Sequence, residues 1–151
     1  MATAPPLSSP RRQRGAAAIE FAAVFVMFFA VFYGAVSYSL PLLMLQSFNA
    51  AASEAVRRSV ALSPSVANYN QMVVTQAETV VMNQLSWIPA SLGFSSANVR
   101  VTYTAGVLTA NISYPKSRLA QVLPFLTLPV IGEIPRLPTH LSAQASLQLV
   151  P

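Results

Sequence analysis

Residues 11–45 read RRQRGAAAIEFAAVFVMFFAVFYGAVSYSLPLLML, and this stretch decides the architecture of the chain. No charged residue occurs between Glu20 and Glu54. A helix of about 20 apolar residues crosses a bilayer core, and the run from Phe21 to Leu45 meets that length. We therefore predict a membrane-spanning helix. A buried core helix is the alternative, but core helices of small domains rarely stay uncharged over so long a run.

Basic residues stand directly before the apolar run, at Arg11, Arg12 and Arg14. They are three of the nine Lys and Arg residues in a chain of formal net charge +5. Basic residues beside an apolar span mark its cytoplasmic flank, so these arginines predict that the N-terminus stays inside and the C-terminus is exported. A nucleic-acid-binding arm would need interleaved aromatic residues or a basic surface elsewhere, so we expect no nucleic-acid partner. Residues 1–14 have no apolar period and predict a disordered leader.

The helical pattern continues beyond the apolar run. Pro41 removes a backbone N–H and crowds the carbonyl four residues earlier, which predicts a kink but no chain reversal. Apolar residues then recur every three to four positions, at Leu42, Leu45, Phe48 and Ala52. Glu54 and Arg58 stand at i and i+4, a favourable order for a helix pair. We expect the helix to end near Leu62, before Ser63 and Pro64.

The remaining residues predict a small α+β head with a second helix and a short antiparallel sheet. Residues 66–86 are amphipathic, and Ser63 or Ser65 can cap that helix. From Asn98 the apolar period becomes two, and the runs on either side of Ala105-Gly106 predict a β-hairpin. A third strand is predicted from Leu141 to the C-terminus. The Pro-rich segment 115–138 predicts a long irregular loop.

The composition argues against an enzyme. The chain has 151 residues, 54% of them hydrophobic and only 9% charged, whereas about a quarter of a soluble domain is charged. It has no cysteine and no aspartate, four glutamates and a single histidine, His140, which we place in a surface loop. Thiol chemistry, zinc sites built on cysteine and a nucleophile–base pair are not supported. We predict no catalytic residue, no metal site, no cofactor and no small-molecule substrate.

The junction between the arginines and the apolar run carries the functional signal. Gly15 lacks a side chain, so an extended backbone can enter a peptidase cleft there. Glu20 is a carboxylate at the fifth position after Gly15, and a charge in the hydrocarbon costs several kcal/mol unless it is paired. The new amino terminus of a neighbouring, cleaved subunit is a cation that would pair with it. The alternative interpretation is an ordinary charge at the membrane interface.

This junction, from Arg11 to Phe21, resembles the class III signal of type IV pilins and pseudopilins. The resemblance implies that a prepilin peptidase cuts after Gly15, that Ala16 becomes the mature N-terminus, and that Glu20 registers subunits in a filament. Within that group the string RGAAAIEF and the Ala- and Arg-rich helical extension most resemble the TadE/TadF-like proteins of the tight-adherence (Flp/Tad) pilus. Classical pilins begin with a methylated Phe, whereas this chain would begin with Ala16, which favours the tight-adherence branch.

The resemblance implies a minor pilin or pseudopilin with three parts: a leader at 1–15, a membrane helix with its periplasmic extension at 16–62, and a periplasmic head at 63–151. Expected partners are the membrane, the peptidase, other pilin-like subunits and pilus assembly platform proteins. The expected location is the bacterial inner membrane, crossed once, or the pilus itself.

Two alternatives are a signal-anchored periplasmic enzyme and a secreted or anchored binding module unrelated to pili. For release, Ala50-Ala51-Ala52 offers a small-x-small cleavage site. Membrane retention discriminates a released module from a pilin-like protein.

Overall fold

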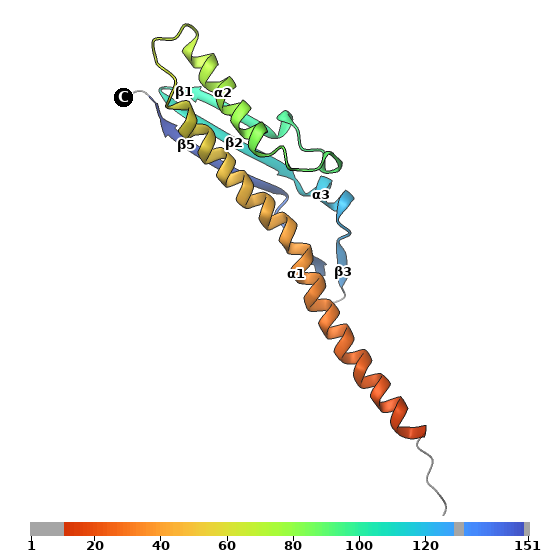
Figure 1. The fold of residues 1–151 in the computed structure, drawn as a ribbon. Helices are drawn as coiled ribbons and strands as arrows, with labels where there is room; N and C mark the ends of the chain where they lie inside the picture. The colour runs from red at the N-terminus through yellow and green to blue at the C-terminus, as the bar shows by residue number, and fades with distance from the viewer. Residues whose placement is uncertain (1–10, 129–131, 150–151) are drawn as a thin grey trace, which may run out of the picture. The chain divides into compact units, whose positions relative to one another are not determined.

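The computed structural model describes residues 11–128 and 132–149, with side chains described from Gly15 onward. It is an α+β structure, as predicted. The helices are α1 (Arg11–Ser59), α2 (Tyr69–Gln84) and α3 (Lys116–Val122), with two short 3₁₀ turns at Ala90–Leu92 and Ser96–Asn98. The strands are β1 (Val99–Thr104), β2 (Val107–Pro115), β3 (Leu126–Leu128), β4 (Gly132–Ile134) and β5 (His140–Gln148). Figure 1 shows their arrangement.

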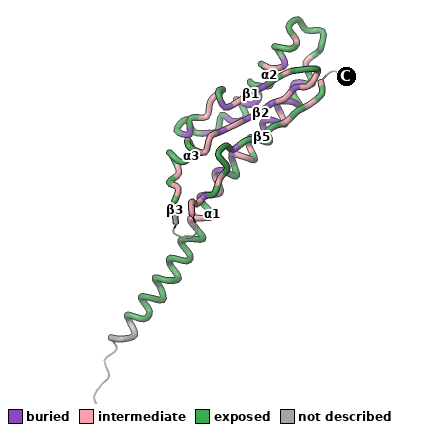
Figure 2. The backbone as a smooth tube through the Cα atoms, turned by 180° about the vertical axis from the view of Figure 1, so that it is seen from behind, coloured by how far each residue is buried: buried purple, intermediate pink, exposed green. Residues whose placement is uncertain are grey.

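The chain divides into two compact units, one that ends at Val36 and one that begins at Ser37. In the first unit the described side chains of α1 are exposed or half-exposed (Figure 2), although most of them are apolar. Within the described part of the chain, α1 is the one helix long and apolar enough to cross a membrane. Residues 1–10 of the predicted leader lie outside the described residues. Residues 11–14 are helical, so the prediction of a disordered leader is wrong for this part.

The predicted boundaries of the first two helices are corrected by a few residues. Helix α1 ends at Ser59, not near Leu62, because the next N–H groups bond to carbonyls three residues back, as Ala61 N does to Arg58 O at 3.2 Å. Helix α2 begins at Tyr69, not at residue 66, and its N-cap is Asn68 in a left-handed conformation. The hydroxyls of Ser63 and Ser65 bond to each other at 2.8 Å, so neither of them caps α2.

The predicted hairpin and third strand form one antiparallel sheet in the order β1-β2-β5. The turn between β1 and β2 has positive φ at both residues, 51° at Ala105 and 79° at Gly106, which suits a two-residue hairpin. Strand β2 is central and alternates regularly, so that Leu108, Ala110, Ile112 and Tyr114 are buried. The opposite face is polar, and the hydroxyls of Thr109 and Ser146 are hydrogen-bonded across it at 2.9 Å.

Helix α1 contributes its second half to the core of the head. Phe48 is fully buried, with its ring centroid 5.6 Å from that of Phe94 and 6.4 Å from that of Tyr114. The Tyr114 hydroxyl donates to the carbonyl of Leu92 at 2.5 Å. Helix α2 packs on the same sheet face, where the rings of Tyr69 and Tyr103 meet edge to face. One face of the sheet is therefore covered by two helices.

The segment predicted as an irregular loop at 115–138 is partly ordered. Helix α3 follows β2 directly, and β3 and β4 pair as a small antiparallel hairpin. Lys116 of α3 pairs with Glu133 of β4 at 2.5 Å and lies 5.4 Å from the centroid of the Phe125 ring. His140 opens β5 instead of lying in a loop, although its side chain is exposed as predicted. Three-residue strands are too short to show a period of two, which is why the sequence did not reveal them.

Candidate processing and assembly site

The residues of the predicted processing site lie together in the first turns of α1. Gly15, Ala16 and Glu20 are all exposed. A side-chain carbon added to Gly15 would meet no other atom within 4 Å. Within its own unit Gly15 is therefore open, and an enzyme can approach it there.

Gly15 lies within helix α1. A peptidase that binds an extended strand must first unwind this turn. The free energy needed to unwind this turn is small for two reasons. Glycine inside a helix is less favourable than alanine by about 1 kcal/mol. The first turn also holds Arg11, Arg12 and Arg14 and no acid, so positive charges stand at the positive end of the helix dipole.

Glu20 shares one side of the helix with small residues. Ala16, Glu20, Ala23, Ala30 and Gly34 follow one another at spacings of four, three, seven and four residues, which place these positions along one face. Small side chains let a second helix approach closely in a membrane. Within the described part of the chain the Glu20 carboxylate has no hydrogen-bond or ion-pair partner. A helix that packed on this face would meet an unpaired carboxylate.

Aromatic rings occupy roughly the opposite side of the same helix. Phe21, Phe25, Phe29 and Tyr33 stack in succession, with ring centroids 6.1, 6.3 and 6.4 Å apart. Phe28 and Phe32 form a parallel pair at 6.1 Å. No role was predicted for this aromatic row, although its spacing of four residues is visible in the sequence. The helix therefore has two faces of different chemistry, a bulky aromatic face and a face of mostly small residues that carries Glu20 and the exposed Met27.

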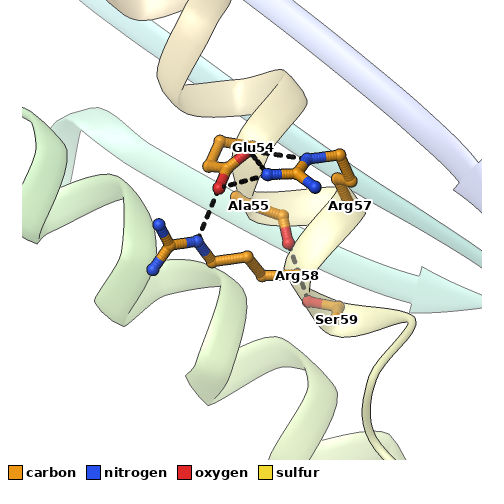
Figure 3. Close-up of polar contacts among 5 residues, drawn as sticks. All are labelled: Glu54, Ala55, Arg57, Arg58 and Ser59. Atoms are coloured by element: carbon orange, nitrogen blue, oxygen red, sulfur yellow. Dashed lines mark hydrogen bonds and ion pairs between the residues drawn. The ribbon is translucent and has the colours of Figure 1, made fainter.

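A second polar cluster lies near the end of α1, where Glu54 binds two arginines (Figure 3). Arg57 donates to its carboxylate through Nε and Nη2, each at 2.8 Å, and Arg58 donates through Nε at 2.6 Å. The hydrogen bond from Arg58, followed by that from Arg57, lowers the pKa of Glu54. The predicted pairing of Glu54 with Arg58 is confirmed. Both arginines are mostly exposed, so the cluster lies on a solvated helix face.

Comparison with known proteins adds one finding. Residues 15–57 match the family model described as TadE-like protein. The matched segment begins at the glycine of the candidate cleavage site and ends within the Glu54 cluster. No curated protein and no solved structure matches the chain.

Proposed function

Over residues 15–57 the chain belongs to the TadE-like protein family, and from this premise we propose that it is a minor pilin or pseudopilin, cleaved by a prepilin peptidase, that takes part in assembly of a tight-adherence pilus. The family itself relates the chain to this pilus system and to pilin-like proteins that are not enzymes. The observation that carries the proposal is the exposed Gly15–Glu20 turn of a long apolar helix that ends in a small α+β head.

Cleavage after Gly15 is supported by the accessibility and weak stability of the first helical turn. It would leave Ala16 as a new amino terminus at the cytoplasmic end of the apolar helix. The membrane location is supported by the exposed apolar surface of α1, which lipid or other apolar helices would cover favourably. The positive flank at Arg11–Arg14 supports an orientation with the head outside the inner membrane.

We assign Glu20 the role of registering subunits. Its carboxylate lies on the small-residue face, where a neighbouring helix packs most closely, and the amino group of that neighbour's Ala16 is the cation that pairs with it. The pairing would offset the cost of holding a charge at the edge of the hydrocarbon, which is several kcal/mol for an unpaired acid. The aromatic face is then left to contact lipid or other subunits of the assembly.

Release of a soluble module by ordinary signal peptidase is poorly supported. Cleavage at Ala50-Ala51-Ala52 would remove the part of α1 that holds Met44 and Phe48, both fully buried in the head. The released domain would lose one of the two helices that cover its sheet. A functional module would therefore have to fold without a large part of its core.

The test is the intact mass and N-terminal sequence of the protein extracted from membranes, with and without a cognate prepilin peptidase. We expect a mature chain that starts at Ala16 only when the peptidase is present. An uncut chain in both samples would contradict processing, and a chain that starts near Ser53 would establish a released module.

Registration is tested separately by Glu20→Ala, which should leave cleavage largely intact and impair piliation. Glu78→Ala is the matched control, because Glu78 is an exposed acid on α2 of the head. Normal piliation with Glu20→Ala would remove the registering role without affecting the cleavage result.

A further inference from the structure

Four aromatic rings in the apolar part of α1 repeat at the spacing of packed helices. Phe21, Phe25, Phe28 and Phe32 follow one another at intervals of four, three and four residues, and each is more than half exposed. At about 100° per residue they lie within roughly 60° of one another around the helix. We call this row the aromatic seam. Intervals of four and three residues mark the contact positions of left-handed helix pairs, and most helix bundles in membranes are left-handed.

The small-residue face repeats at the same intervals on roughly the opposite side of the helix. From Ala23 it continues through Met27, Ala30 and Gly34, again at four, three and four residues. An open apolar hollow of about 410 Å³ lies on this part of α1, lined by Ala23, Val24, Met27, Phe28 and Val31. A side-chain carbon added to Gly34 would meet no other atom within 4 Å. One side of the helix therefore carries rings, and the other has room for rings at the same period.

The pairing proposed for Glu20 fixes how two such helices are offset. If its carboxylate meets the amino group of a neighbour's Ala16, the neighbour is displaced by four residues along the helix axis, or about 6 Å. The rings of the neighbour's Phe21, Phe25 and Phe28 then stand at the heights of residues 25, 29 and 32. These heights fall at or close to the midpoints between residues 23 and 27, 27 and 30, and 30 and 34. Each ring thus meets a gap between two side chains, which is the arrangement of knobs into holes.

We propose that the aromatic seam is a docking surface for a second copy of this chain, and that it packs into the small-residue face of that copy. The two surfaces differ, so the contact is heterologous and can repeat from copy to copy. Each step adds the same offset along the axis, so repeated steps do not close into a ring. The helices run in the same direction, as anchorage in one membrane requires. The offset rests on the Glu20 pairing in the proposed function, whereas the match of the two faces does not.

A second copy explains the two rows better than the other apolar partners do. Contact with lipid alone requires no order among the rings. An unrelated helix would have no reason to place its rings at the heights of these gaps. In this chain both rows have the same intervals, and the offset required by Glu20 brings the rings of one copy to the gaps of the next.

Disulfide formation between two differently tagged copies of the full chain tests the docking. Both copies are produced in bacteria that carry a cognate prepilin peptidase, and their membranes are oxidised mildly. The chain has no cysteine, so each copy carries one introduced thiol. Phe28→Cys on one copy is combined with Gly34→Cys on the other, two residues away in height. Phe28→Cys with Ala23→Cys is the control for height, because the offset separates them by nine residues, or roughly 13 Å. Without the offset both pairs would be about equally far apart.

We expect at least fivefold more disulfide between Phe28→Cys and Gly34→Cys than between Phe28→Cys and Ala23→Cys. Two copies that both carry Phe28→Cys test a symmetric contact and should also give at least fivefold less. Equal yields at the two heights, or a dominant symmetric dimer, would overturn the docking proposal. Absence of any disulfide between the tagged copies would overturn it too, because the seam would then face lipid or another protein.

A bulky residue on the small-residue face should block the same contact. Ala30→Phe, added to the copy with Gly34→Cys, fills the gap that receives the ring of Phe28 and should reduce the disulfide at least fivefold. Ala22→Phe is the matched control, because the replacement is identical and position 22 lies about 60° or more from either row around the helix. It should leave the disulfide unchanged, and equal losses for the two changes would contradict docking on this face.

The intact mass of the same membrane protein separates this inference from the proposed function. A chain that starts at Ala16 but gives a symmetric disulfide or none would overturn the docking and leave the cleavage intact. An uncut chain would contradict the cleavage and the pairing of Glu20 with a new amino terminus. In that case the disulfides alone would still decide whether the aromatic seam meets the small-residue face.

Discussion

Replacement of Phe48 by alanine tests whether α1 is a structural part of the head or only its membrane stalk. Phe48 has no exposed surface and packs between Phe94 and Tyr114. Removing a buried phenyl ring costs about 3–5 kcal/mol, from lost burial and the cavity that remains. For a domain near 100 residues this corresponds to a decrease in Tm of roughly 10–20 °C. Phe32→Ala is the matched control, because Phe32 lies on the same helix but is 55% exposed.

The assay is unfolding of the full chain in detergent micelles, followed by the fluorescence of Trp87, the single tryptophan of the chain. Trp87 lies in the head between α2 and the first 3₁₀ turn, so its signal reports head unfolding. We expect a large loss of stability for Phe48→Ala and less than about 0.5 kcal/mol for Phe32→Ala. Equal effects of the two changes, or a loss below about 1 kcal/mol at Phe48, would refute the argument that the head core includes α1.

Three further changes test other parts of the head by the same unfolding assay. Tyr114→Phe removes the hydroxyl that donates to the Leu92 carbonyl. The free energy of unfolding should fall by about 1–3 kcal/mol, because a buried acceptor is left unpaired. An unchanged unfolding midpoint would mean that water replaces the hydroxyl. Gly106→Ala should destabilise the β1–β2 turn by about 1 kcal/mol, because Gly106 has φ of 79° and a residue with a side chain is strained there. Gly34→Ala is the control, because Gly34 is helical and its replacement should not destabilise the head. The lowered pKa of Glu54 means that its pairing stabilises the fold above the ordinary carboxyl pKa, and that this contribution is lost as the pH falls through the lowered value. Glu54→Gln should remove that part of the acid sensitivity, and an identical pH profile in the variant would contradict it.

Helix α1 has two environments along one continuous element. Before Ser37 its apolar residues face outward, and after Ser37 the helix is amphipathic, with Met44, Phe48 and Ala52 turned into the head. A cut in the second half of α1 would remove buried core residues such as Met44 and Phe48, whereas the core residues all lie far beyond a cut after Gly15. The fold therefore tolerates processing at the leader and opposes processing near Ala52.

Local pattern was enough to predict much of the molecule. The uncharged run after Glu20 identified the apolar helix, and the alternation on either side of Ala105-Gly106 identified the hairpin, because both signals repeat over many residues within one element. The string from Arg14 to Glu20 was enough to indicate the family. The roles of Gly15, Ala16 and Glu20 in processing and registration remain predictions.

Tertiary structure decided what depends on contacts between distant residues. The sequence placed Leu42 on one stripe with Phe48 and Ala52, but Met44 is buried and Leu42 is 54% exposed. Around the helix Met44 lies closer to Phe48 than Leu42 does. The β3–β4 hairpin was missed because its strands are held by one another and by the pair of Lys116 with Glu133, not by any local period. The hydrogen bond from the Arg136 N–H to the Tyr38 hydroxyl joins residues 98 positions apart, and no local period indicates it. An apolar run has the same sequence pattern whether lipid or protein covers it. Its length alone therefore does not determine where a membrane span ends and a protein core begins.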